Sequence, residues 1–284
     1  MGELVLAAKI THVPSMFISE QPGPHHGCRE AAIEGHREIA RRAAELEADT
    51  YVVIDTHWLV NSGYHVNANP WHHGTYTSNE FPHFIREMPF DHLGDTELGH
   101  AIAVHATKRG VRTRAHDDVP SLGLEYGTLV PMRYMSPIAP LRVVSVAGWM
   151  YDATIDESHQ VGEAIRDAIE ASDRRVVLLA SGSMSHRIWP NHDVEDGMFA
   201  ISRPFNKHVD LMVLDMWREG RTAEFVEMLP DYADHCAGEG HMHDTAMLLG
   251  ALGWDRYTGR AEVLTEWFPS SGTGQCNVVF PVDG

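Results

Sequence analysis

The chain has 284 residues, of which 43% are hydrophobic and 22% are charged, and its formal net charge is −18 with the histidines neutral. This charge argues against a nucleic-acid partner, because phosphate binding needs a basic surface. No apolar stretch approaches the ~20 residues that cross a membrane, and the first residues lack the features of a signal peptide. Cys28, Cys236 and Cys276 form no C-x-x-C motif. We therefore expect a cytoplasmic protein with no membrane partner, and a homo-oligomer on base rates.

Strands and helices are predicted to alternate along the chain. Short apolar runs at residues 4–8, 51–54, 143–147 and 176–180 are typical of buried parallel strands. Helices are predicted at residues 28–46, 95–109, 156–171, 203–237 and 243–252, with Asp95 or Thr96 as a cap, breaks near Gly220 and Pro230, and stops at Gly110 and Gly253. The pattern predicts a single α/β domain over residues 1–284, with a mostly parallel central sheet flanked by helices on both faces.

The segment from residue 61 to residue 95 is rich in Pro, Asn, Gly and His. A loop of this length without secondary structure is uncommon unless it has a function. We expect it to be an excursion over the active face.

Three of the twenty histidines fall near the ends of predicted strands. His12 follows the first strand, His57 follows the second, and His186 comes a few residues after the run at 176–180. Ligands of open α/β sheets bind outside the carboxyl ends of the strands. Each histidine alone is more simply explained as a hydrogen-bonding residue in a turn. Together, His12 and His57 at adjacent strand ends predict two imidazole ligands for one metal ion.

Glu239 lies between two glycines, which allow close approach of the backbone and leave the carboxylate unobstructed. By itself the segment is also typical of a Gly-rich turn before a helix. With His12 and His57, Glu239 would complete a set of two histidines and one carboxylate, which suits Fe(II) with open positions. The neighbouring His241 and His243 form a rival set with Glu239.

His186 follows a run of small residues that contains Ser181, Ser183 and Ser185. A histidine in such a turn can act as a general base. A Ser–His nucleophile is the alternative, but the Gly-x-Ser-x-Gly elbow of hydrolases is missing from this string.

Several of these motifs together resemble those of class III extradiol ring-cleavage dioxygenases, the superfamily of protocatechuate 4,5-dioxygenase. They are Ile10-Thr11-His12-Val13-Pro14-Ser15-Met16, Asp55-Thr56-His57-Trp58, Gly182-Ser183-Met184-Ser185-His186-Arg187 and Gly238-Glu239-Gly240. The strings at residues 76–80, 124–135 and 270–275 are similar to the branch that acts on 3,4-dihydroxyphenylacetate (homoprotocatechuate). The resemblance extends over essentially the whole chain.

The resemblance implies that His12, His57 and Glu239 bind a non-haem Fe(II), with Mn(II) as an alternative, and that His186 is the catalytic acid–base residue. It implies extradiol cleavage of a catechol by O2 to a 2-hydroxymuconate semialdehyde. Many family members carry a second active-site histidine where this chain has Tyr126. Tyr126 would then donate a hydrogen bond to bound oxygen, or His116 would substitute for the missing histidine.

The resemblance leaves the side chain of the catechol open, so protocatechuate or a gallate-type substrate is an alternative. Arg133 or Arg187 is a candidate partner for a substrate carboxylate. A zinc hydrolase with the same ligands and a non-catalytic binding protein on the same scaffold are the rival functions.

Overall fold

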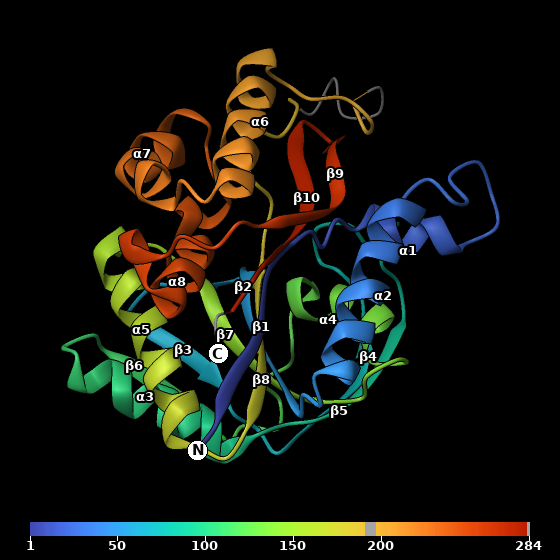
Figure 1. Cartoon of the computed structure of the whole chain (residues 1–284). Helices are drawn as coiled ribbons and strands as arrows, with labels where there is room; N and C mark the ends of the chain where they lie inside the picture. The colour runs from blue at the N-terminus through green and yellow to red at the C-terminus, as the bar shows by residue number, and fades with distance from the viewer. Residues whose placement is uncertain (191–196, 283–284) are drawn as a thin grey trace.

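The protein is built around an eight-stranded sheet with a separate two-stranded sheet beside it (Figure 1). The structure is a computed structural model that describes residues 1–190 and 197–282. The strands are β1 (Glu3–Ile10), β2 (Thr50–Val60), β3 (Tyr64–Asn67), β4 (Trp71–Tyr76), β5 (Met88–Leu93), β6 (Thr113–His116), β7 (Arg142–Met150), β8 (Arg175–Ser181), β9 (Glu262–Ser270) and β10 (Thr273–Phe280). The helices are α1 (Ser15–Glu20), α2 (Glu30–Glu45), α3 (Thr96–Lys108), α4 (Tyr126–Met135), α5 (Ile155–Ala171), α6 (Pro204–Glu219), α7 (Thr222–His235) and α8 (His243–Leu252), with short 3-10 turns η1 (Glu239–Met242) and η2 (Trp254–Arg256).

The central sheet is mostly parallel, as predicted. Its strand order is β6-β3-β7-β2-β8-β1-β10-β9, and the four strands β7, β2, β8 and β1 all run parallel. Antiparallel pairing occurs where β3 meets β7 and where β10 joins β1 and β9. The expectation that His12 and His57 follow adjacent strands is wrong, because β8 lies between β1 and β2. The crossover through α2 leaves one position open, and β8 fills it later in the chain.

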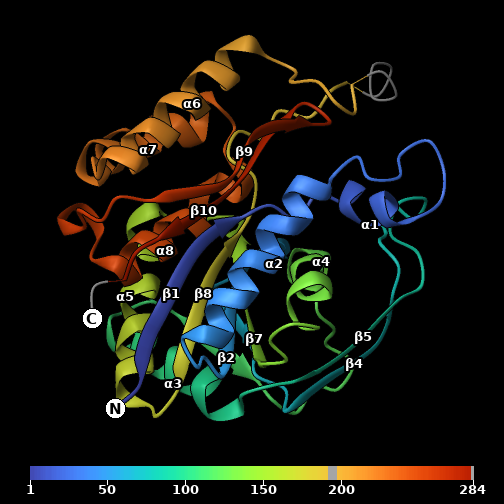
Figure 2. The same ribbon diagram turned by 45° about the vertical axis from the view of Figure 1, so that its right-hand side comes forward.

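Helices cover both faces of the sheet, as predicted. Alternate residues of β8 point to opposite faces: Val177 and Leu179 pack in the core beneath α2 and α4, whereas Val176 and Leu178 pack in the core beneath α3, α5 and α8. Figures 1 and 2 show α2 and α4 on one side of the strands and α3, α5 and α8 on the other. The α6–α7 pair lies beyond the carboxyl ends of the central strands.

Most of the predicted helix ends are confirmed. The Asp95 side chain caps α3 by accepting from the backbone N–H of Leu98 at 3.1 Å. Gly220 and Gly253, with φ of 73° and 114°, follow α6 and α8 in the left-handed conformation that glycine tolerates. The predicted break at Pro230 is wrong, because α7 continues through it. Pro230 removes one helical hydrogen bond, but the neighbouring Leu229 is fully buried and fixes the helix against the core.

The excursion at residues 61–95 contains the three strands β3, β4 and β5. Strand β3 joins the central sheet, and β4 and β5 pair as an antiparallel hairpin. Most side chains of the β4–β5 pair are at least partly exposed, so the pair lacks the continuous apolar run by which the buried strands were predicted. None of the helices that the structure describes is long and apolar enough to span a membrane.

Candidate metal centre

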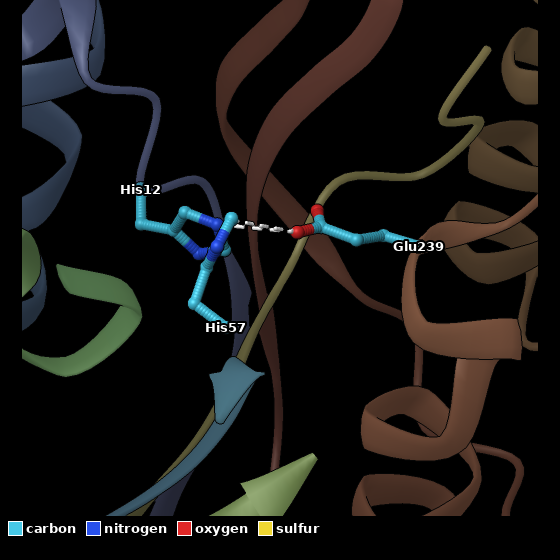
Figure 3. A group of neighbouring side chains, drawn as sticks. All are labelled: His12, His57 and Glu239. Carbon is cyan, nitrogen blue, oxygen red and sulfur yellow. Dashed lines mark ion pairs between the residues drawn. The ribbon is translucent and has the colours of Figure 1, made fainter. Parts of the chain in front are cut away.

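The side chains of His12, His57 and Glu239 converge at the carboxyl-end edge of the central sheet (Figure 3). His12 lies in the loop after β1. His57 lies inside β2, where the pairing with β7 is irregular between Asp55 and Leu59. Glu239 begins η1 and approaches the two imidazole rings from the opposite side. Three distant parts of the chain therefore meet at one point.

The geometry of the three side chains suits a metal ion. His12 Nε2 and His57 Nε2 each lie 3.3 Å from Glu239 Oε1, and one ligand atom from each residue lies within 4.8 Å of the others. His12 and Glu239 are buried and His57 nearly so. Over residues 1–190 and 197–282, no other group of three or more His, Cys, Asp or Glu side chains meets the same distance criterion.

Hydrogen bonds around His12 leave its Nε2 free for a metal. The Ser181 hydroxyl lies 2.5 Å from the carbonyl oxygen of Gly127, to which it donates, and 2.9 Å from His12 Nδ1. Since the serine hydrogen is used, the serine oxygen accepts from a protonated Nδ1. His12 therefore presents an unprotonated Nε2, which is the form that binds a metal.

His57 is oriented by neighbours on both sides. Its backbone N–H donates to Asp55 Oδ1 at 2.8 Å, and the Thr128 hydroxyl donates to Asp55 Oδ2 at 2.7 Å. The Tyr126 ring packs against the imidazole with 3.7 Å between centroids. His57 Nδ1 lies 3.6 Å from Glu80 Oε2. At this distance the carboxylate acts on the ring through its charge rather than through a hydrogen bond.

Glu239 is held by two donors and by an unusual backbone. The Thr56 hydroxyl lies 2.8 Å from Oε1 and the backbone N–H of Ser183 donates to Oε2. Gly240, His241 and Met242 all have positive φ, between 53° and 63°. Two of them are not glycines, and such strained backbone clusters at functional sites.

The charge state of Glu239 follows from its histidine neighbours. Burial raises the pKa of its carboxyl, but His186 and His12 outweigh that effect and hold the pKa well below its usual value. Glu239 is therefore an anion at neutral pH and can serve as a metal ligand.

His186 lies beside the three side chains, after β8. Its Nδ1 is 3.5 Å from Glu239 Oε2 and 3.2 Å from the Ser183 hydroxyl. Burial lowers the pKa of His186, Glu239 opposes this, and His57 and His12 lower it further. The net effect is a lowered pKa, so the ring is neutral at neutral pH and can exchange a proton.

The remaining predicted residues have other partners. The Tyr126 hydroxyl donates to Glu80 Oε2 at 2.9 Å. His116 belongs to the edge strand β6, three strands from β2, and its Nε2 lies 2.8 Å from His65 Nδ1. His116 therefore does not take the place of the missing histidine. Arg133 makes two bonds of 2.7 Å to Glu20, so it is already paired.

The rival ligand set is not assembled. His243 is buried with its Nδ1 2.7 Å from the Ser158 hydroxyl, and His241 is exposed. Of the three serines proposed as nucleophiles, Ser181 donates to a backbone carbonyl and Ser185 donates to Asp210 at 2.8 Å.

Sequence reasoning missed two parts of the site. The first is Glu80, which lies in the loop between β4 and β5. Its place in the string 76–80, which supported the family resemblance, could have identified it. Lys9 and Asp244 form a fully buried ion pair. A Cβ on Gly182 would lie within 3.1 Å of both Asp244 Oδ2 and Lys9 Nζ, so the pair packs directly behind the turn that holds Glu239.

Comparison with known proteins decides the family. Residues 6–281 match the family described as the catalytic LigB subunit of aromatic ring-opening dioxygenase. The chain belongs to this family. As a member of the LigB family it is an oxidoreductase, and the hydrolase and binding-protein alternatives are not favoured. The family is metal-dependent, and the donor set of His12, His57 and Glu239 fits a divalent first-row ion.

Two curated relatives and one solved structure illustrate the relationship. A 3,4-dihydroxyphenylacetate 2,3-dioxygenase of Escherichia coli is 54% identical over 260 residues, which are 92% of this chain and 94% of the relative. The 2-aminophenol 1,6-dioxygenase beta subunit of a Pseudomonas species is 26% identical over 253 residues, 84% and 82% of the two chains. The crystal structure of an uncharacterized protein from Escherichia coli K12 shares the fold, with a TM-score of 0.64, 15% identity and coverage of 97% and 99%.

Proposed function

We propose that the protein cleaves the ring of 3,4-dihydroxyphenylacetate in the extradiol position with O2, giving a 2-hydroxymuconate semialdehyde. The observation that carries the proposal is the convergence of His12, His57 and Glu239 with His186 beside them. The substrate follows from the 54% identity over 92% of the chain to a relative named for that reaction. On this proposal residues 1–284 form one catalytic domain.

His12, His57 and Glu239 would hold the metal, which we propose to be Fe(II). When bound, Fe(II) supplies open coordination positions for the catechol and O2 and relays electron density between them. Three protein ligands would leave coordination positions for two further reactants. The buried position of His12 and Glu239 limits access of water to the reacting atoms.

His186 would exchange protons with the substrate. Its lowered pKa keeps the ring neutral at neutral pH, so one nitrogen accepts and the other donates. Such a group can take a proton from a catechol hydroxyl and return a proton when the ring opens. Tyr126 would assist by holding the orientation of His57, because its ring packs against that imidazole and its hydroxyl donates to Glu80.

The substrate carboxylate needs a cation. Arg133 is engaged by Glu20, which leaves Arg187 of the two candidates. Arg187 follows His186 directly and its side chain is exposed. We propose that Arg187 pairs with the carboxylate, so that Arg187→Met raises KM for 3,4-dihydroxyphenylacetate about tenfold or more and leaves KM for 4-methylcatechol unchanged.

We further propose that the protein is cytoplasmic, because its three cysteines are free. On base rates we also propose that it is a homo-oligomer. Light scattering would measure the stoichiometry, and a monomer at working concentration would contradict this proposal.

A substrate and metal panel tests the proposed function. The metal-free protein is reloaded anaerobically with Fe(II), Mn(II) or Zn(II), and oxygen consumption is followed with 3,4-dihydroxyphenylacetate, protocatechuate, gallate and catechol. We expect the highest kcat/KM with Fe(II) and 3,4-dihydroxyphenylacetate. Faster turnover of protocatechuate would overturn the substrate assignment, and equal activity with Mn(II) would overturn the metal assignment.

A further inference from the structure

A chain of three buried polar side chains lies behind His186. Ser183 Oγ is 3.2 Å from His186 Nδ1, Gln275 Nε2 donates to Ser183 Oγ at 2.6 Å, and the Thr11 hydroxyl donates to Gln275 Oε1 at 2.5 Å. Ser183 is 4% exposed, Gln275 1% and Thr11 0%. The chain connects strand β10 to the turn after β8 and to the residue before His12. None of these three side chains is needed for the metal ligation described above.

The direction of each hydrogen bond in this chain is fixed by its neighbours. The Thr273 hydroxyl donates to the carbonyl oxygen of Ser270 at 2.6 Å, so its oxygen can only accept from Gln275, 2.7 Å away. The amide nitrogen of Gln275 must therefore face Thr273. The same nitrogen gives its second hydrogen to Ser183, and the amide oxygen accepts from Thr11.

These directions determine which nitrogen of His186 carries the hydrogen. The Ser183 oxygen already accepts from Gln275, and a buried hydroxyl left without an acceptor is costly. His186 Nδ1 is the acceptor within reach of that hydroxyl. We propose that Ser183, oriented by Gln275, is a positioning residue that holds His186 in the tautomer protonated at Nε2.

The consequence concerns the order of proton transfers, and it rests on the proposed function. A His186 ring protonated at Nε2 offers a donor at the nitrogen that Ser183 does not hold. His186 then enters the reaction as a hydrogen-bond donor at Nε2, and it acts as an acid only after Nδ1 has taken up a proton.

The opposite tautomer has its own candidate partner, which makes the proposal testable. Glu239 Oε2 lies 3.5 Å from the same Nδ1 and would accept from a protonated Nδ1. That distance exceeds the usual hydrogen-bond range, and Oε2 already accepts from the backbone N–H of Ser183. Removal of the Ser183 hydroxyl should therefore shift the ring toward the tautomer protonated at Nδ1.

The test is long-range ¹H–¹⁵N correlation NMR of the full-length, metal-free protein labelled at histidine, at neutral pH, with the His186 signals identified by their loss in His186→Phe. We expect an unprotonated Nδ1 in the wild type, and protonation of Nδ1 in Ser183→Ala and Gln275→Leu. Ser183→Thr, which keeps a hydroxyl, should retain the wild-type tautomer. Ser185→Ala is the matched control, because its hydroxyl belongs to the same turn but donates to Asp210.

A protonated Nδ1 in the wild type, an unchanged tautomer in Ser183→Ala, or an equal change in Ser185→Ala would each overturn the proposal. If Ser183→Ala does not fold, the His186 tautomer in Gln275→Leu is compared with that in Ser183→Thr, and the proposal requires the two to differ. In the metal-loaded enzyme Ser183→Ala should lower kcat about tenfold with KM unchanged. The tautomer of His186 is measured without metal or substrate, so this measurement does not depend on the proposed function. If the expected tautomer is observed but the iron-loaded protein does not cleave the ring, only the proposed function is contradicted.

Discussion

The Tyr126 hydroxyl donates to Glu80 Oε2 at 2.9 Å, and this oxygen lies 3.6 Å from His57 Nδ1. The bond joins the loop between β4 and β5 to the first residue of α4. Both partners contact His57, Glu80 through its carboxylate and Tyr126 through its ring. The two residues therefore orient one imidazole together.

A double-mutant cycle tests this relationship. Tyr126→Phe keeps the ring but removes the donor, and Glu80→Gln removes the charge behind His57. Each should lower kcat/KM about 10- to 100-fold. Since the two share one hydrogen bond, their effects should be non-additive by about 1 kcal/mol or more. Additive losses would show that each acts on its own.

Glu239→Gln tests the metal ligand. The carboxamide keeps the size of the side chain but removes the anion, so affinity for Fe(II) should fall at least ~100-fold in anaerobic calorimetry. Glu262→Gln is the control, because Glu262 is an exposed partner of Arg42. Unchanged affinity in Glu239→Gln would remove Glu239 from the ligand set.

His186→Phe separates proton transfer from metal binding. Loss of the acid–base group should lower kcat by ~10²-fold or more. Because His12, His57 and Glu239 remain, metal content after anaerobic loading should stay at the wild-type level. Loss of the metal would identify His186 as a ligand instead.

The buried pair of Lys9 and Asp244 is expected to matter for stability. Lys9→Met or Asp244→Leu alone leaves an uncompensated buried charge and should lower the free energy of unfolding by about 3–5 kcal/mol. The double variant removes both charges, so it should lose much less than the sum of the two. Urea denaturation of the metal-free protein measures all three, and a double variant as unstable as the sum would refute the argument.

His243 predicts a pH dependence of stability. Burial, followed by the effect of His241, lowers the pKa of His243 in the folded protein to about 4, from 6.5. The unfolded chain therefore binds a proton first, and up to about 3 kcal/mol of stability is lost as the pH falls from 6.5 toward 4. His243→Gln should flatten this part of the urea-derived stability profile. The exposed His235→Gln serves as control, and an equal change there would argue against His243 as the source.

The sequence predicted the parts of the fold that depend on local pattern. Apolar runs at residues 51–54 and 176–180 located β2 and β8, and Gly253 ended α8 as expected. Strands β9 and β10 were not predicted. The position of β8 between β1 and β2 could not be predicted from the order of the strands along the chain. It depends on the connection from β1 to β2, which leaves space in the sheet for one strand between them.

The candidate site was also predicted only in part, because local sequence features identify some of its residues and the contacts between distant segments determine the others. His12 and His57 stood out because they follow apolar runs, and Glu239 because glycines flank it. Glu80 and Tyr126 are 46 residues apart in the chain, and no periodic pattern predicted the β4–β5 hairpin whose loop brings Glu80 to Tyr126. Gln275 belongs to the string 270–275 that supported the family resemblance. Its contact with Ser183 could not be predicted, because it depends on the antiparallel pairing of β10 with β1.

Oxygen uptake by the Fe(II)-loaded protein with 3,4-dihydroxyphenylacetate tests the central claim most directly. The proposed function predicts consumption of one O2 for each molecule of substrate, together with a yellow ring-opened product, and loss of both in Glu239→Gln. An iron-loaded wild-type protein that binds the catechol but consumes no oxygen and forms no yellow product would contradict it.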